Sequence, residues 1–236
     1  GYTSAPTVLA VHPLALERKQ RDRIISNSLS LGGSYLSQTL SAGGTTINLK
    51  NVYFNSSQKA GFPDEGEVLI PFYDTSVTPN RWNMERILYG SKNTSANTLT
   101  VATNGRGNEG TTAAAHTVLT GTYSVSQNST SVTISLGSNH NFTTGENRVY
   151  LDFTSGTNIV QTDNNAADPS NNYVTHTPPD GVYDVTVVSA QVFTIEIPNE
   201  LRRINPASAN SYFDTGYPAT ITGNVSLLPE VRLRSL

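Results

Sequence analysis

The sequence predicts an all-β protein, with two small sandwich-like or barrel-like units behind an amino-terminal arm. Beyond about residue 38, short segments alternate apolar and polar side chains with the period of two expected of a half-buried strand. Turns rich in glycine and asparagine separate these segments. A chain of 236 residues is long enough to bury a real core in one large domain or two small ones.

Residues 1–38 lack this alternation, and we expect them to form the arm. Pro13 opens a candidate short helix over about 14–26, although its apolar residues form no clean stripe at helical spacing. Four basic residues crowd into this segment, namely Arg18, Lys19, Arg21 and Arg23. Because Glu17 and Asp22 are interspersed, the segment fits either a solvated helix face or an arm that docks on an acidic partner. We predict a partner-binding role for the four basic residues.

The first β unit is expected over residues 39–122. Its predicted strands are 46–52, 68–70, 86–89 and 99–101, each with alternating or fully apolar character. The stretch between Phe72 and Met84 holds Pro79 and Trp82, and it indicates a long excursion between strands. Trp82 is therefore predicted to be exposed and available to a partner.

The second β unit is expected over residues 123–226. Its alternating segments are 122–125, 131–136, 149–153, 181–188 and 192–195. Residues 163–172 are too polar for a core and indicate an exposed loop. The last segment, 227–236, alternates apolar and charged residues, so it is predicted to be a carboxyl-terminal arm, either an edge strand or an addition to a neighbour's sheet. Arg232 and Arg234 are the predicted partner contacts in this arm.

Composition argues against several classes of protein. The formal net charge is −3 and only 14% of residues are charged, which gives no reason to expect nucleic-acid binding. There are no cysteines, so disulfides, thiolate metal sites and cysteine nucleophiles are excluded. No apolar run approaches the roughly 20 residues that a membrane-spanning helix needs.

The side chains that could perform catalysis or bind metals show no recognisable pattern. A Gly-x-Ser-x-Gly elbow is absent, and His116 and His140 adjoin turns, where histidine often makes a local hydrogen bond. The carboxylates Glu65 and Glu67 follow a Gly-Phe-Pro turn and are expected to be solvated. Asp163 and Asp168, with Asp152 or Asp180, are candidate calcium ligands, but the sequence lacks the spacing that calcium loops require. We predict no enzyme activity, no cofactor and no metal.

Two sets of motifs carry a resemblance to known proteins. Segments 66–70, 85–89, 97–100 and 106–116 together resemble a module widespread in virion proteins of tailed bacteriophages, notably marine and cyanobacterial ones. Segments 140–145, 149–153 and 181–195 are similar to a second phage module. Within the first module, Glu85 and Arg106 are expected to pair and to fix a turn against the sheet.

The resemblance implies a virion structural protein without enzymatic activity, acting as an adaptor at the tail, neck or fibre base through multivalent assembly. Its expected partners are portal, tail or fibre proteins and further copies of itself. One alternative is a capsid decoration protein. Another is a module that binds carbohydrate on the host surface, for which the candidate aromatic side chains are Tyr73, Trp82, Tyr173 and Tyr212.

Overall fold

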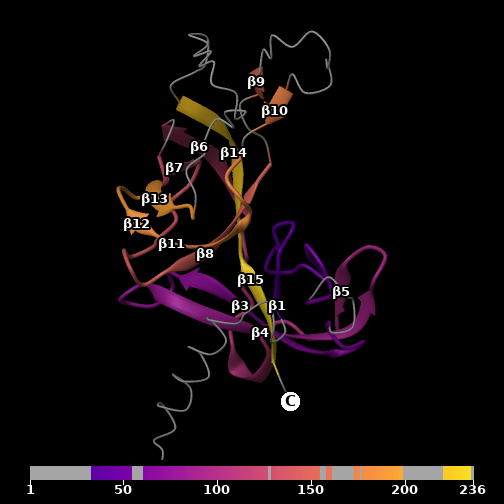
Figure 1. The fold of residues 1–236 in the computed structure, drawn as a ribbon. Coiled ribbons are helices and arrows are strands. Elements are labelled where there is room, and N and C mark those ends of the chain that lie inside the picture. Colours follow the sequence, from indigo (N-terminus) through magenta and orange to yellow (C-terminus); the bar gives the residue numbers. More distant parts are fainter. Residues whose placement is uncertain are drawn as a thin grey trace, which may run out of the picture.

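The computed structural model describes residues 33–54, 61–126, 129–154, 158–160, 173–175, 177–198 and 220–234. These residues form a half-barrel and a nearly closed barrel, so the predicted all-β class is confirmed (Figure 1). Within these ranges, no helix has the length and apolar character needed to cross a membrane.

The half-barrel is a six-stranded antiparallel sheet. Its strands, in spatial order, are β1 (Gly33–Tyr35), β15 (Glu230–Arg234), β3 (Gly66–Asp74), β4 (Arg81–Asn93), β5 (Thr98–Val101) and β2 (Thr46–Asn48). An isolated bridge between Leu36 and Leu49 joins the segments that follow the two edge strands, so the sheet curls around its core. Apolar side chains fill that core, among them Ile47, Ile70, Ile87 and Val231.

The second barrel is a seven-stranded sheet with its own core. Its order is β11 (Gly181–Asp184), β8 (Arg148–Phe153), β14 (Thr220–Leu228), β6 (Leu119–Ser126), β7 (Ser131–Leu136), β13 (Val192–Glu196) and β12 (Thr186–Val187). In β7, Val132, Ile134 and Leu136 point into the core while the intervening residues face outward, as the alternation predicts. A separate ribbon pairs β9 (Asn158–Val160) with β10 (Tyr173–Thr175).

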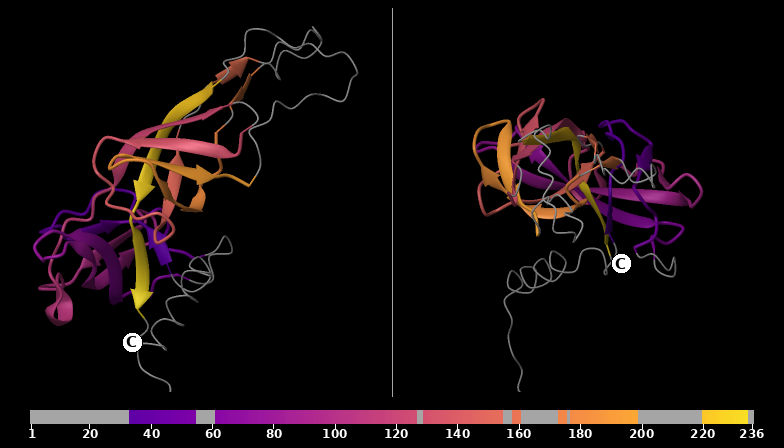
Figure 2. Two further views of the ribbon diagram at one scale, coloured as in Figure 1. Left: turned by 90° about the vertical axis from the view of Figure 1, so that its left-hand side faces the viewer. Right: turned by 45° about the horizontal axis from the view of Figure 1, so that its top comes forward.

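The chain's last strands tie the two sheets together. Strand β14 lies between β6 and β8 in the barrel, and after Pro229 the chain continues as β15 between β1 and β3 in the half-barrel. Figures 1 and 2 show this yellow segment running from one sheet into the other. Residues 227–234, expected in a carboxyl-terminal arm, thus lie inside the molecule's own sheets and not at an edge.

The expected excursion between Phe72 and Met84 is largely a long β-hairpin. Strands β3 and β4 stay paired out to Asp74 and Arg81, so both Tyr73 and Trp82 lie on strands. The prediction of a loop was wrong because Pro79 and the polar residues fall within the short connection, while the flanking residues extend the ladder.

Two other expected boundaries differ from those in the structure. Strand β6 crosses the expected division at residues 122 and 123. The expected strand 181–188 is interrupted at Val185, which separates β11 from β12. Residues 1–32, with the candidate helix, and residues 163–172, with the expected loop, lie outside the described residues.

Candidate functional site

Glu85 of β4 is the centre of a buried charge cluster in the half-barrel. Its side chain is fully buried, and its carboxylate accepts five hydrogen bonds. Arg106 donates two of these bonds, from Nε to Oε1 at 2.7 Å and from Nη2 to Oε2 at 2.9 Å. The backbone N–H groups of Gly107 and Ala114 donate two more, each at 3.0 Å. His116 Nε2 lies 2.7 Å from Oε2.

Arg106 uses all its donors within this cluster. Besides its two bonds to Glu85, it donates to the carbonyl oxygens of Ser41, Gly44 and Ala114. A guanidinium has five N–H groups, and each of them has an acceptor here. The arginine therefore connects β4 to two segments that have no strand ladder with it, and the predicted Glu85–Arg106 pair is confirmed.

His116 completes the cluster from the far end of the 106–116 segment. Its Nδ1 lies 3.0 Å from the carbonyl oxygen of Pro71, and its Nε2 faces Glu85. Both ring nitrogens therefore face oxygen atoms of β3 and β4.

The pKa of Glu85 reflects the same surroundings. Burial alone would raise the pKa of this carboxyl group. The hydrogen bonds from Arg106, His116, Ala114 and Gly107 outweigh burial, and they lower the pKa from 4.5 to about 2.

A second buried carboxylate, Glu67 of β3, fastens the middle of the same segment. Arg86 donates to it from Nε and Nη2 at 3.0 and 3.1 Å, and Asn108 donates from Nδ2 at 2.9 Å. Arg234 of β15 donates to the same carboxylate at 2.6 Å. Arg86 also contacts the carboxylate of Glu109. The expectation that Glu67 is solvated was wrong, because only 1% of its surface is exposed.

The two clusters explain the residue pattern of segment 106–116. Gly107, which both clusters flank, has a φ of +60°, and a Cβ there would lie 2.7 Å from the carbonyl oxygen of Thr111. The segment thus turns tightly while its charged and polar groups bond to β3 and β4. The charged groups of both clusters bond to other groups of the same chain, and these contacts hold the segment against β3 and β4.

The junction of the two barrels contains a third cluster of charged groups, centred on Lys50. Its Nζ lies 3.0 Å from Asp152 and 3.3 Å from Asp180, and it donates to the Tyr150 hydroxyl at 3.3 Å. Burial opposes the charge of Lys50, but the bonds to Asp152 and Tyr150 outweigh it, so the lysine pKa is raised. Tyr150 also stacks on Tyr35 with ring centroids 3.9 Å apart. Asp152 and Asp180, two of the candidate calcium ligands, therefore already bind a cation, the ammonium group of Lys50.

We expect Lys50→Met to destabilise the protein by about 1 kcal/mol. The Lys50–Asp152 ion pair is partly exposed, and partly exposed ion pairs contribute modestly to stability. The variant also leaves two neighbouring carboxylates without their cation. A double-mutant cycle with Asp152→Asn, measured by urea unfolding, isolates the pair. Additive effects in that cycle would contradict a direct interaction.

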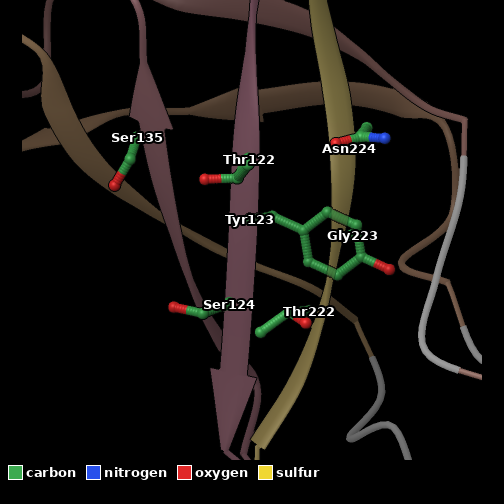
Figure 3. A pocket seen from close by; sticks show the side chains of 7 residues that line it. All are labelled: Thr122, Tyr123, Ser124, Ser135, Thr222, Gly223 and Asn224. Atoms are coloured by element: carbon green, nitrogen blue, oxygen red, sulfur yellow. The ribbon is translucent and has the colours of Figure 1, made fainter.

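A shallow hollow of about 360 Å³ lies on the outer face of the second barrel, over β6, β7 and β14. Figure 3 shows the seven residues that line it: Thr122, Tyr123, Ser124, Ser135, Thr222, Gly223 and Asn224. Its side chains supply hydroxyl and amide groups but no carboxylate, imidazole or amine. The lining is therefore neutral and polar.

Tyr123 lies beside this hollow, opposite Gly223 across the β6–β14 ladder. Figure 3 shows its ring lying across β14 at the glycine. The ring is 1% exposed and packs edge-on against Phe153. Burial raises the pKa of its hydroxyl to about 12, and that oxygen has no hydrogen-bond partner among the residues that the structure describes.

Tyr123→Phe should therefore leave stability unchanged or raise it by up to about 1 kcal/mol, because an unpaired buried hydroxyl is itself a cost. The midpoint of urea unfolding tests this. A clear loss of stability would show that the hydroxyl has a bonding partner.

Three of the predicted partner-binding residues lie in the described part of the chain, and each of them makes contacts within the molecule. Arg232 pairs with Glu230, and Arg234 with Glu67, so both take part in contacts within the chain. Trp82 is 41% exposed, yet it contacts the second barrel. The basic residues of the amino-terminal segment lie outside the described residues: Arg18, Lys19, Arg21 and Arg23.

Several structurally important residues were missed in the sequence. Glu67 stands beside Val68 at the start of an apolar run, and a carboxylate next to buried positions was a signal of a buried pair. Lys50 had no such signal, because its partners lie about 100 and 130 residues further along the chain. His140 does form the local hydrogen bond expected for it, accepting from the backbone N–H of Phe142.

Within the described ranges, no three histidine or carboxylate side chains gather as a metal site. Comparisons with protein-family models, curated proteins and solved structures find no match to this chain.

Proposed function

We propose that this chain is a non-enzymatic structural protein of a tailed-bacteriophage virion. It serves as an adaptor at the tail, neck or fibre base and acts through multivalent assembly. The observation that carries the proposal is that the buried charged groups bond to one another within the chain. Arg106 pairs with Glu85, and Arg86 pairs with Glu67. Such charge pairs stabilise the fold, and a stable fold presents a fixed surface to neighbouring proteins.

The tie between the two sheets also supports an adaptor. The β14–β15 segment belongs to both sheets, and the Lys50 and Tyr35–Tyr150 contacts add a second link. A force applied to one barrel is therefore passed directly to the other. A connector between two parts of a particle needs this property.

The outer face of the second barrel favours neutral polar contacts. A row of side chains directly opposite one another crosses five strands: Thr222, Ser124, Thr133, Thr194 and Thr186. All five carry hydroxyl groups, and none is charged or large and apolar. Each contact through such a face is weak, so a durable assembly through it needs many copies, which the symmetry of a virion supplies.

The test uses the full-length chain with three preparations: isolated tails, tailless expanded capsids and a neutral soluble polysaccharide. Co-sedimentation measures binding, and light scattering measures the chain's own oligomeric state. An adaptor forms a closed oligomer or binds the isolated tails. Binding to capsids alone identifies a decoration protein, and binding to polysaccharide alone identifies a carbohydrate-binding module. A monomer that binds none of them contradicts the proposal, as does hydrolysis of the polysaccharide.

A further inference from the structure

A line of aromatic rings runs from the β3–β4 hairpin into the core of the second barrel. Trp82 stacks on Phe142, with centroids 5.9 Å apart and planes 17° apart. Phe142 stacks on His140 at 4.8 Å, and both rings meet Phe193 of the core edge-on. Tyr73 contacts Trp82 from the neighbouring strand. The exposed tip of the half-barrel is thereby joined to the interior of the other barrel.

The loop that carries this line is held in a specific conformation. Asn141 has a φ of +57°, and its carbonyl oxygen accepts a hydrogen bond from Trp82 Nε1 at 3.1 Å. The backbone N–H of His140 bonds to the carbonyl oxygen of Ala190. The tryptophan therefore contacts two consecutive residues of one loop, one through its N–H and the other through its ring.

His140 fixes this loop through both of its ring nitrogens, and its ring is 2% exposed. Its Nε2 lies 2.9 Å from the carbonyl oxygen of Ser189, so Nε2 carries the proton and donates. Its Nδ1 accepts the backbone N–H of Phe142 at 3.0 Å. The geometry thus specifies the neutral ring with its proton on Nε2. A second proton on Nδ1 would face an N–H donor and would break this bond.

We propose that the contact of Trp82 with residues 141 and 142 locks the two barrels at one relative orientation, and that protonation of His140 releases this lock. The ring cannot take a second proton while Nδ1 accepts from Phe142. Acid therefore favours a state in which residues 140–142 leave their position, Phe142 loses its stacking partner and Trp82 is freed. The Lys50 contacts and the β14–β15 segment remain, so release permits rotation and not separation.

The groups packed on the His140 ring do not offer another acceptor for that proton. They are Phe142 of its own loop, Phe193 of β13 and the Ser189 carbonyl group of the turn before β13. The nearest charged groups along these elements are Glu146 and Arg148 beyond the loop and Glu196 at the end of β13. Arg148 pairs with Asp184, and Glu196 accepts a hydrogen bond from Thr130. None of these groups contacts the ring.

Trp82 is the chain's single tryptophan, so its fluorescence reports on this lock alone. The experiment titrates the full chain from pH 7.5 to 5, the interval in which histidine is the side chain that ordinarily changes its charge. We expect a reversible red shift and a roughly twofold rise in acrylamide quenching, with unchanged far-ultraviolet circular dichroism. Small-angle scattering should show a change in overall dimensions over the same range.

Two variants decide the assignment. His140→Gln removes the titrating group, so its tryptophan signal should not change with pH, whether the lock is closed or open in that variant. His116→Gln removes a buried histidine of the other sheet and should keep the transition. A flat titration in the unmodified chain, or a transition that survives in His140→Gln, overturns the proposal. So does a parallel loss of circular dichroism, which would mean global unfolding. These measurements use the isolated chain, so they are independent of whether it belongs to a virion.

Discussion

Glu85→Gln should lower the free energy of unfolding by about 3–5 kcal/mol, the largest effect we expect from a single substitution. The amide keeps the size of the side chain but has one acceptor oxygen where the carboxylate has two. Arg106 would then be a buried cation without its counter-ion, and the N–H groups of Gly107 and Ala114 would compete for what remains. Urea unfolding followed by circular dichroism measures the change.

The matched control is Glu65→Gln, which makes the same substitution at the residue directly before β3. Glu65 is exposed, so its substitution should change stability by less than about 0.5 kcal/mol. Equal effects of the two substitutions would contradict a structural role for the Glu85 cluster.

Glu85 should also make the protein sensitive to acid. The pKa of Glu85 in the folded protein, about 2, lies below its ordinary value of 4.5, so folding favours the ionised form. Its contribution is therefore fully present above about pH 4.5 and is lost as the pH falls toward 2. We expect the stability difference between the unmodified chain and Glu85→Gln to shrink over that range. A constant difference would show that Glu85 titrates normally.

Truncation after Leu228 should unfold the half-barrel and leave the second barrel folded. The deletion removes β15, which has hydrogen-bonded neighbours on both sides, β1 and β3. It also removes Val231, which is fully buried in the core, and the Arg234 contact to Glu67. Backbone amides of β1 and β3 would lose their protection from hydrogen exchange, while those of β6 and β7 would keep it.

A synthetic peptide of residues 229–236 serves as the control for this truncation. If β15 acts as an interior strand, the added peptide should restore protection of β3 in a concentration-dependent way. Unchanged protection of β3 in the truncated chain would mean that the segment is a dispensable arm, as the sequence had indicated.

The sequence predicted the local structure well wherever residues close in the chain decide it. The segment 131–136 is predicted to be a strand and is one, because alternation records which side chains face the core. The Glu85–Arg106 pair was also expected, since the glycines around residue 107 bring the arginine back onto the sheet. Trp82 was expected in a loop, because a proline nearby concealed the continuing ladder of the hairpin.

The amino-acid sequence alone thus determined the fold class and most strands, since a strand's two faces are encoded by a period of two. It did not determine the position of β15, the burial of Glu67 or the contact between Trp82 and Phe142. These features join segments about 60 to 200 residues apart. The partner of a strand or a charge at such a distance depends on how the whole chain packs, and no local pattern records it.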